Sequence, residues 1–419
     1  MANTYLTRTP SGAGTSNKIF TLSVWVKRTG FGQLAITGSG DSNGYNNVFL
    51  EFNGSNQLRF AQLDSSSFPF EYITTRVFRD VNAWYHIVCT CDSTNNTEAD
   101  RIKIYVNGVR ETSFSTTNHP PLNQVFKWND ARVHSIGREG AWDARYFDGL
   151  MSHFHNIDGT AYQASTFGST DSTTGEWKIN ASPSVNYGTN GWFMFKDDNS
   201  LNDDSGNGNN FSLGSGTLTK TEDNPSNIFC TLNSLATGNS APTFSKGNNR
   251  VVANASGYQF SCGTIAVPLT GKWYWEVKAN DNVNGSSTEY LIGAVLESRL
   301  EASGNFAEFA ADGITQYGSV GTGIGQNDII GVSVDRTAAT LKIYKNNSLI
   351  LTKSSLPAEL IYPMVTVYGS VSADANFGNG YFGGTAVSSA GTNASNNGIF
   401  EYDVIPSDAN ALSTKGLNL

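Results

Sequence analysis

Basic residues are the scarcest feature of this chain of 419 residues. Lys and Arg together number 27 against 36 Asp and Glu, so the net charge is −9, and no run of basic residues occurs. Proteins that bind nucleic acids or anionic membrane surfaces rely on clustered Lys and Arg. We therefore expect no nucleic-acid partner.

Long apolar runs are also missing. No stretch approaches the roughly 20 residues that a membrane-spanning helix needs, so we expect no membrane insertion. The first residues, Met1-Ala-Asn-Thr-Tyr-Leu-Thr-Arg8, hold no apolar core of a signal peptide, so the sequence predicts synthesis and folding in a cytoplasm.

Cysteine is rare, and its placement suits neither disulfides nor zinc. Cys89 and Cys91 are two positions apart on one expected strand and point to the same face, and Cys230 and Cys262 are isolated. No Cys-x-x-Cys pair exists. We expect reduced, buried thiols.

Helical periodicity is absent as well, and strand signals take its place. The chain has 43 Gly but only 11 Pro, and short apolar runs alternate with segments rich in Asn, Ser, Thr and Gly. Such a pattern is typical of many short strands joined by turns. The sequence predicts an all-β protein of two antiparallel β-sandwich (jelly-roll-like) domains in tandem.

One hairpin pattern occurs twice. Trp84-Tyr-His-Ile-Val-Cys-Thr-Cys-Asp92 is followed by Ile102-Lys-Ile-Tyr-Val-Asn-Gly108, and Asp328-Ile-Ile-Gly-Val-Ser-Val-Asp335 by Leu341-Lys-Ile-Tyr-Lys-Asn-Asn347. Asn and Gly tolerate the positive φ of tight turns. The distance between the copies favours two domains over a repeat array. We predict one sandwich at 1–220, a linker at 221–240, a second sandwich at 241–385 and a C-terminal tail at 386–419.

The first half carries an ordered series of motifs. Phe20 leads to Trp25-Val26, then come Trp84-Tyr-His-Ile-Val88, Ile104-Tyr-Val-Asn-Gly108 and Phe147-Asp-Gly-Leu-Met151. This series resembles the laminin-G / concanavalin-A-like lectin family. The resemblance implies a two-sheet sandwich with partner-binding loops at its rim.

The second half carries a sharper series. Gly271-Lys-Trp-Tyr-Trp-Glu-Val277, the strand ending at Asp335, the Lys-Ile-Tyr strand and Ala375-Asn-Phe-Gly378 resemble the SPRY domain. That resemblance implies another β-sandwich, one that binds protein or peptide partners and has no catalytic role.

The combination of the two halves resembles virion proteins of tailed bacteriophages, especially marine ones. The resemblance implies a fibre, spike or surface component of the virion, with other virion proteins as partners and a homo-oligomeric state. The expected function is non-enzymatic binding to a host-surface glycan or to neighbouring virion proteins. The alternatives are a purely structural capsid decoration protein without a ligand, and a glycan-processing enzyme.

Catalysis is disfavoured by a missing motif. Glycosidases of the concanavalin-A-like type place their acid and nucleophile in a Glu-x-Asp-x-x-Glu triplet on one strand, and this chain has none. We therefore predict no enzymatic activity.

Calcium is the one cofactor that the sequence suggests. Laminin-G-like domains often hold Ca²⁺ at the sheet rim, and oxygen ligands suit this cation. The candidate ligands are Asp41, Asn46 and Asp143, and the alternative is that their loops form ordinary Asx turns. Asp203-x-Ser205-x-Asn207 imitates the start of an EF-hand loop but has Gly214 at the twelfth position.

A sugar platform needs aromatic rings beside polar side chains. Trp128, Trp142 and Tyr146 lie in or beside loops rich in Asn, Asp and Arg, so they are the candidate ligand-binding residues. The alternative is that these rings cap the sandwich or face a neighbouring subunit.

Overall fold

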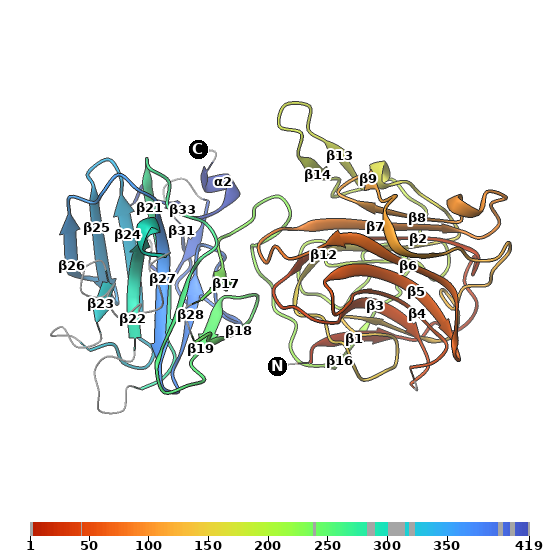
Figure 1. Cartoon of the computed structure of the whole chain (residues 1–419), viewed down its shortest axis with the longest axis horizontal. Coiled ribbons are helices and arrows are strands. Elements are labelled where there is room, and N and C mark those ends of the chain that lie inside the picture. Colours follow the sequence, from red (N-terminus) through yellow and green to blue (C-terminus); the bar gives the residue numbers. More distant parts are fainter. Residues whose placement is uncertain are drawn as a thin grey trace. The chain divides into compact units, whose positions relative to one another are not determined.

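The computed structural model describes residues 3–42, 44–237, 240–282, 290–300, 315–317, 323–392, 397–402 and 407–417. Contacts within the chain divide it into two units, Met1–Lys220 and Thr221–Leu419. Among the described residues the α-helices are α1 (Glu297–Leu300) and α2 (Thr414–Leu417), and the chain is otherwise built of strands (Figure 1). No helix in these ranges has the length and apolar character needed to cross a membrane.

Unit 1 is a sandwich of two antiparallel sheets. The larger sheet has the order β10 (Phe114–Asn118), β6 (Ser67–Val77), β5 (Gln57–Asp64), β4 (Asn47–Phe52), β3 (Leu34–Gly40), β11 (Val133–Ile136), β1 (Tyr5–Arg8) and β16 (Ser212–Ser215). The smaller has the order β15 (Trp192–Met194), β12 (Gly149–Asp158), β2 (Ile19–Arg28), β7 (Tyr85–Asp92), β8 (Ile102–Val106) and β9 (Val109–Arg110). A separate hairpin of β13 (Gly168–Thr170) and β14 (Trp177–Ile179) and two 3₁₀ turns, η1 (Glu98–Asp100) and η2 (Ala164–Thr166), complete the unit.

The core of unit 1 follows the two-residue period of its strands. On β4, Val48, Leu50 and Phe52 join the hydrophobic core between the sheets. Successive side chains of a strand point to opposite faces, so Phe49 and Glu51 lie on the face turned away from that core.

Unit 2 is a second sandwich. One sheet has the order β17 (Leu232–Thr237), β20 (Tyr258–Gly263), β27 (Ile361–Tyr368), β22 (Tyr290–Leu296) and β23 (Thr315–Tyr317). The other has the order β18 (Thr243–Ser245), β19 (Arg250–Val252), β28 (Ser372–Asn376), β21 (Lys272–Ala279), β24 (Ile329–Asp335), β25 (Thr340–Lys345) and β26 (Ser348–Ser354), with β33 (Asn410–Ala411) parallel to β21. Two short pairs, β29 (Tyr381–Phe382) with β30 (Thr385–Ala386) and β31 (Gly391–Thr392) with β32 (Ile399–Phe400), lie outside these sheets.

The architecture confirms the predicted fold class. Trp275 and Phe377 are fully buried in the core of unit 2, as the two motifs containing them predict. All four cysteines are buried and are thiols rather than disulfides. Burial raises the pKa of the Cys262 thiol to about 12, so this thiol stays protonated.

The duplicated hairpins are confirmed and match in detail. β7 pairs with β8 and β24 with β25, each antiparallel. After the second strand, Asn107 and Asn346 both have φ of 47°. The Oδ1 of Asn107 accepts a hydrogen bond from the His86 backbone N–H at 2.8 Å, and that of Asn346 from the Ile329 N–H at 2.9 Å. The same side chain thus fixes the same corner in both units.

The predicted linker is not a free connection. Phe229, Cys230 and Leu232 are buried, and β17 is an edge strand of unit 2. The Cys230 N–H donates to the Leu412 carbonyl at 2.8 Å, and the Thr414 N–H donates to the Ile228 carbonyl at 2.9 Å. The segment entering unit 2 therefore pairs with the segment that the sequence predicts to be a tail, because both carry apolar residues that need burial.

The described part of that tail is held by a buried carboxylate. Glu276 on β21 is fully buried and accepts the backbone N–H groups of Glu401 and Tyr402 at 2.8 and 2.9 Å. Burial is the largest influence on Glu276 and raises its pKa to about 7. Residues 393–396, 403–406 and 418–419 of the predicted tail lie outside the described residues.

Candidate functional site

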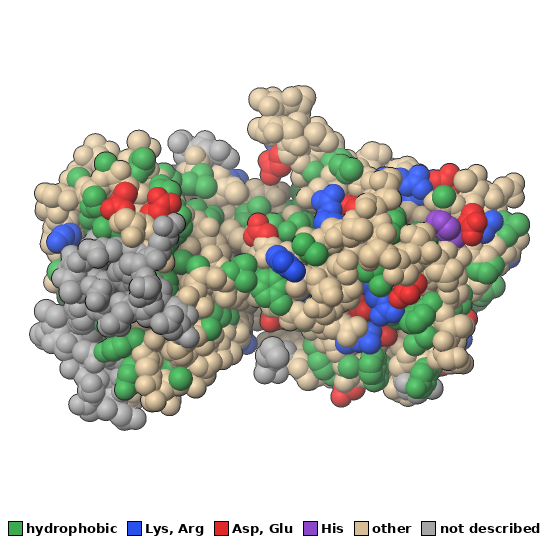
Figure 2. All heavy atoms as spheres, viewed as in Figure 1, with side chains coloured by type: hydrophobic (Ala, Val, Ile, Leu, Met, Phe, Trp, Pro, Cys, Tyr) green, Lys and Arg blue, Asp and Glu red, His purple; other side chains and the backbone are tan. Residues whose placement is uncertain are grey.

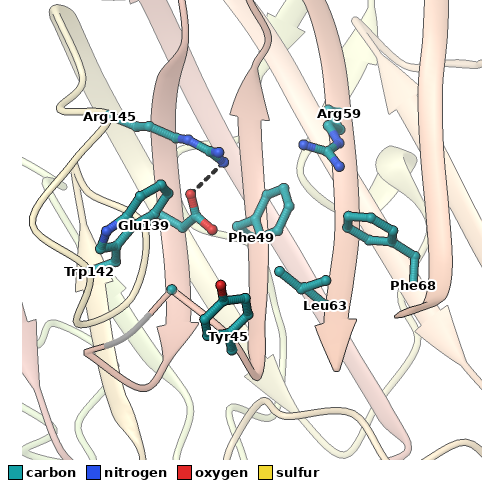
Figure 3. Close-up of a pocket in the computed structure, with 9 residues that line it drawn as sticks. Tyr45, Phe49, Arg59, Leu63, Phe68, Glu139, Trp142 and Arg145 are labelled. Atoms are coloured by element: carbon teal, nitrogen blue, oxygen red, sulfur yellow. Dashed lines mark hydrogen bonds and ion pairs between the residues drawn. The ribbon is translucent and has the colours of Figure 1, made fainter. Parts of the chain in front are cut away.

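A cavity of about 210 Å³ opens on the outer face of the larger sheet of unit 1. Strands β4 and β5 form its floor, Phe68 of β6 borders it on one side, and the loop that carries Glu139, Trp142 and Arg145 borders it on the other (Figure 3). The residues that line it are Gly44, Tyr45, Phe49, Arg59, Leu63, Phe68, Glu139, Trp142 and Arg145.

The floor carries a network of charged side chains whose pairing is set by the strand register. Glu51 on β4 lies directly opposite Arg59 on β5, and their charged groups are 3.2 Å apart. Arg59 also donates to Glu71 of β6 at 2.8 Å. Its guanidinium lies 5.0 Å from the ring centres of both Phe49 and Phe68, within the range of cation–π attraction. Arg59 is therefore fixed by both carboxylates and rings.

The loop after β11 forms one wall because glycines let it approach the sheet. A Cβ on Gly38 of β3 would come within 2.5 Å of the Gly140 nitrogen and 3.1 Å of the Glu139 carbonyl carbon. Only glycine at position 38 permits this contact, since real Cβ atoms essentially never approach so closely. The close contact places Glu139 at the edge of the floor.

Glu139 and Arg145 form the polar centre of this wall. The Arg145 Nη1 lies 2.6 Å from Glu139 Oε2 and 3.2 Å from Glu51 Oε2, so one guanidinium bridges two carboxylates (Figure 3 marks the Glu139 contact). Burial raises the pKa of Glu139 to about 7, Arg145 opposes this rise, and Glu51 adds to it. Glu139 therefore changes charge near neutral pH.

Aromatic side chains surround this centre. The Arg145 guanidinium lies 4.7 Å from the centre of the Trp142 ring, and Trp142 is half-buried. The Trp142 ring lies against Gly44, whose φ of +73° and missing side chain leave room for it. Tyr45 is 54% exposed at the mouth of the cavity.

Three of the predicted residues lie next to this cavity without lining it. Asn46 Nδ2 donates to Asp41 Oδ2 at 3.2 Å, directly beside Tyr45 in the sequence. Asp143 is exposed, and its carboxylate lies 3.5 Å from the Arg138 guanidinium. The same carboxylate accepts a hydrogen bond from the Tyr146 hydroxyl. Of the predicted aromatic residues, Trp142 alone lines the cavity.

The other two predicted aromatic residues, Tyr146 and Trp128, do not line the cavity. The Tyr146 ring packs on Tyr5 with centroids 5.8 Å apart, away from the lining residues. Trp128 is fully buried, donates its indole N–H to Asn156 at 3.0 Å and stacks on Phe20. Its assignment as a surface ligand-binding residue is wrong, because the indole satisfies its one donor inside the core.

One contact involves a predicted calcium ligand. Asn46 Oδ1 accepts a hydrogen bond from the Lys127 ammonium at 2.8 Å, so a cation already faces this oxygen. Among the described residues no group of three His, Cys, Asp or Glu side chains is placed to hold a metal ion.

In the loop that resembles the start of an EF-hand, the Asp203 carboxylate accepts hydrogen bonds from neighbouring protein groups. The Asp203 carboxylate accepts the backbone N–H groups of Phe193, Ser205 and Asn209 and the Ser205 hydroxyl, all between 2.8 and 2.9 Å. A carboxylate has about four acceptor sites, so these four donors occupy it.

Sequence reasoning missed most of the cavity. Glu51 and Arg59 sit at the polar positions of alternating strands, which is also the pattern of an ordinary solvent-facing surface. The register that brings Glu51 opposite Arg59 is set by a longer turn, in which the Asn53 N–H donates to the Gln57 carbonyl at 2.9 Å and Asn56 has a φ of 63°. A two-residue turn at Asn53-Gly54, the signal visible in the sequence, would place Glu51 opposite Asn56 instead. The loop that covers them could not be placed from the sequence.

Charged side chains of both signs are interspersed on the surface of the described residues in Figure 2. On the face of the molecule in Figure 2, Lys and Arg side chains lie singly or beside Asp and Glu side chains, and they do not merge into a basic patch.

Comparison with known families places the cavity within a recognised stretch. The family model of the concanavalin A-like lectin/glucanases superfamily (Laminin_G_3) matches residues 2–165. All the residues that line the cavity lie in this stretch. The match covers less than half of the chain, and unit 1 has the corresponding concanavalin-A-like sandwich fold. No curated protein matches the chain.

Solved structures give distant likenesses. The SPRY domain of human HERC1 is 14% identical, with 34% of this chain and 96% of that chain covered and a TM-score of 0.27. The TRIM65 PSpry domain is also 14% identical, with 35% and 91% covered and a TM-score of 0.26. A putative carbohydrate binding protein from Bacteroides ovatus is 17% identical, with 51% of this chain and 57% of that chain covered and a TM-score of 0.33. Likenesses this distant do not identify a function.

Proposed function

We propose that unit 1 is a carbohydrate-binding module and that its ligand enters the cavity between Trp142, Tyr45 and Phe68. The observation that carries this proposal is the combination of aromatic rings with fixed polar groups in one hollow on a rigid sheet. Aromatic faces suit the apolar face of a sugar ring, while carboxylate and guanidinium groups suit its hydroxyls. The match to a superfamily that includes lectins supports it.

The proposed role is binding without chemical conversion. A glycosidase needs two carboxyl groups that reach the sugar, one as acid and one as nucleophile or base. Glu51 is fully buried and is held by Arg59, Arg145 and Gln33 at 3.0 to 3.2 Å. Its oxygens are already engaged, which favours a structural role over nucleophilic attack.

The test is binding of the full chain to an immobilised panel of glycans. We expect binding to one group of glycans, lost in Trp142→Ala and Tyr45→Ala. Tyr258→Ala is the matched control, because Tyr258 is 37% exposed and belongs to unit 2. Equal binding by the wild type and Trp142→Ala would reject the cavity as the site, and release of reducing sugar would reject the non-enzymatic role.

The setting of this binding is a second part of the proposal, and it depends on the sequence resemblance to tailed-bacteriophage virion proteins alone. There a homo-oligomeric surface component would present many copies of a weak site, and multivalency would raise the avidity for a host surface. Labelling of particles with an antibody against this chain tests it. Labelled particles that adsorb normally with Trp142→Ala would favour the decoration role instead.

A further inference from the structure

The charges around the cavity are unequal. Three carboxylates, from Glu51, Glu71 and Glu139, face two guanidiniums, from Arg59 and Arg145. Among the described residues, the ion pairs of these two guanidiniums are all with these three carboxylates. The arginines therefore neutralise the protein's own acidic groups, and they leave no surplus of positive charge for a ligand.

The size of the cavity limits the ligand further. A volume of about 210 Å³ lies below the roughly 300–1,000 Å³ of pockets that enclose drug-sized ligands. A hollow of this size accommodates one sugar ring.

Resting on the proposed carbohydrate binding, we propose that the cavity selects an uncharged terminal sugar ring and that Glu139 is the residue that rejects carboxylated sugars. A uronate or sialate carboxylate at Arg145 would have to displace Glu139 or lie beside it. Either arrangement leaves a carboxylate without its cation in a half-buried site, which costs binding energy. Neutral hydroxyls can donate to Glu139 and need no such exchange. Specificity of this kind arises from a repulsive element built against the wrong ligand.

The groups that face Glu139 come from each element around it. Glu51 lies on β4, Arg59 on β5, and Arg145 on the same loop as Glu139, while Asn47 Nδ2 lies 3.5 Å from its Oε1. Among these groups Glu51 is the only acidic one, and the guanidiniums of Arg145 and Arg59 form ion pairs with it. Acidic sugars should therefore be rejected most strongly when Glu139 is charged. Burial raises the pKa of Glu139 to about 7.

The experiment compares sugars that differ only at one carbon. Methyl glucoside with methyl glucuronide, and methyl galactoside with methyl galacturonide, are titrated into the full chain and followed by ligand-observed NMR. We expect the wild type to prefer the neutral member of the pair that binds by about tenfold or more at pH 8. Glu139→Gln should reduce the preference to about threefold or less, and Glu98→Gln, an exposed carboxylate outside the lining residues, should leave it unchanged.

A second measurement covers the case in which Glu139→Gln fails to fold. In the wild type the preference should shrink between pH 8 and pH 5.5, because Glu139 gains a proton while the uronate stays charged. Equal or tighter binding of the uronide at pH 8, still lost in Trp142→Ala, would overturn this inference and leave carbohydrate binding intact. Binding of either sugar that survives Trp142→Ala would overturn the proposed function itself.

Discussion

Arg145 and Glu139 are six residues apart and meet over the sheet, with Nη1 and Oε2 separated by 2.6 Å. The same nitrogen lies 3.2 Å from Glu51, which is fully buried. Arg145→Ala should therefore destabilise unit 1 by about 2–4 kcal/mol, because two neighbouring carboxylates lose their shared cation. Urea unfolding measures this loss. The double variant Arg145→Ala/Glu139→Gln should lose less than the single one, and an equal or larger loss would contradict the coupling.

Gly38 fixes the height of the loop that carries Glu139. Gly38→Ala places a methyl group 2.5 Å from the Gly140 nitrogen, so the loop must move away from β3. We expect a stability loss of about 1–3 kcal/mol and weaker glycan binding. Gly54→Ala is the matched control, since a Cβ there meets nothing within 4 Å. Identical behaviour of the two variants would show that the contact carries no constraint.

Acid should weaken unit 1. Burial lowers the pKa of His86 to about 3 and those of His134 and His153 to about 4, and it lowers that of His155 well below its usual value. The unfolded chain takes up these protons below about pH 6.5, so stability is lost as the pH falls below that value. Glu139 has a raised pKa and acts in the opposite direction, but four histidines outweigh it. The unfolding temperature of unit 1 should drop by several degrees between pH 7 and pH 5.

Unit 2 should respond to acid in the opposite sense. It contains no histidine, and its Glu276 has a pKa raised by burial to about 7. A raised carboxyl pKa stabilises the fold fully below the unfolded value near 4.5, and this contribution is lost as the pH rises through 7. Calorimetry of the full chain should therefore show two transitions that shift in opposite directions between pH 7 and pH 5. In Glu276→Gln the transition of unit 2 should no longer shift over this range.

Trp275 is an anchor of the core of unit 2. It is fully buried on β21, so Trp275→Ala should cost about 3–5 kcal/mol. Denaturant unfolding of unit 2 measures the loss, with the exposed Leu269→Ala as control. A loss below about 1 kcal/mol would mean that the strand is not in the register described here.

Features formed by residues close together in the sequence could be predicted, whereas features formed by distant residues could not. The two hairpins were evident because an apolar strand, an Asn-containing turn and a returning strand lie within a short span. Trp128 was misassigned because its sequence neighbours, Lys127 and Asn129, are polar, whereas its partner Asn156 lies 28 residues further on. Local polarity described the loop but not the side chain that turns inward from it.

The candidate site shows the same limit. Trp142 was identified because an aromatic residue in a polar loop stands out in a sequence. Glu51 and Arg59 did not stand out, because charged residues at alternate strand positions usually face water. Their role arises only when the loop carrying Glu139 and Arg145 folds over them, and that contact joins residues about 90 positions apart.

The pairing of distant segments within each unit orders the events of synthesis. Unit 1 is closed by β16 against β1, so it can complete its sheet once residue 215 has left the ribosome. Unit 2 is closed by residues 410–414 against β21 and the segment at 228–230, nearly 200 residues later. At synthesis rates of about 5–20 residues per second, unit 1 would remain folded for roughly 10–40 s while the nascent unit 2 cannot yet close. During that interval unit 2, and not unit 1, is the part of the chain exposed to proteases and chaperones.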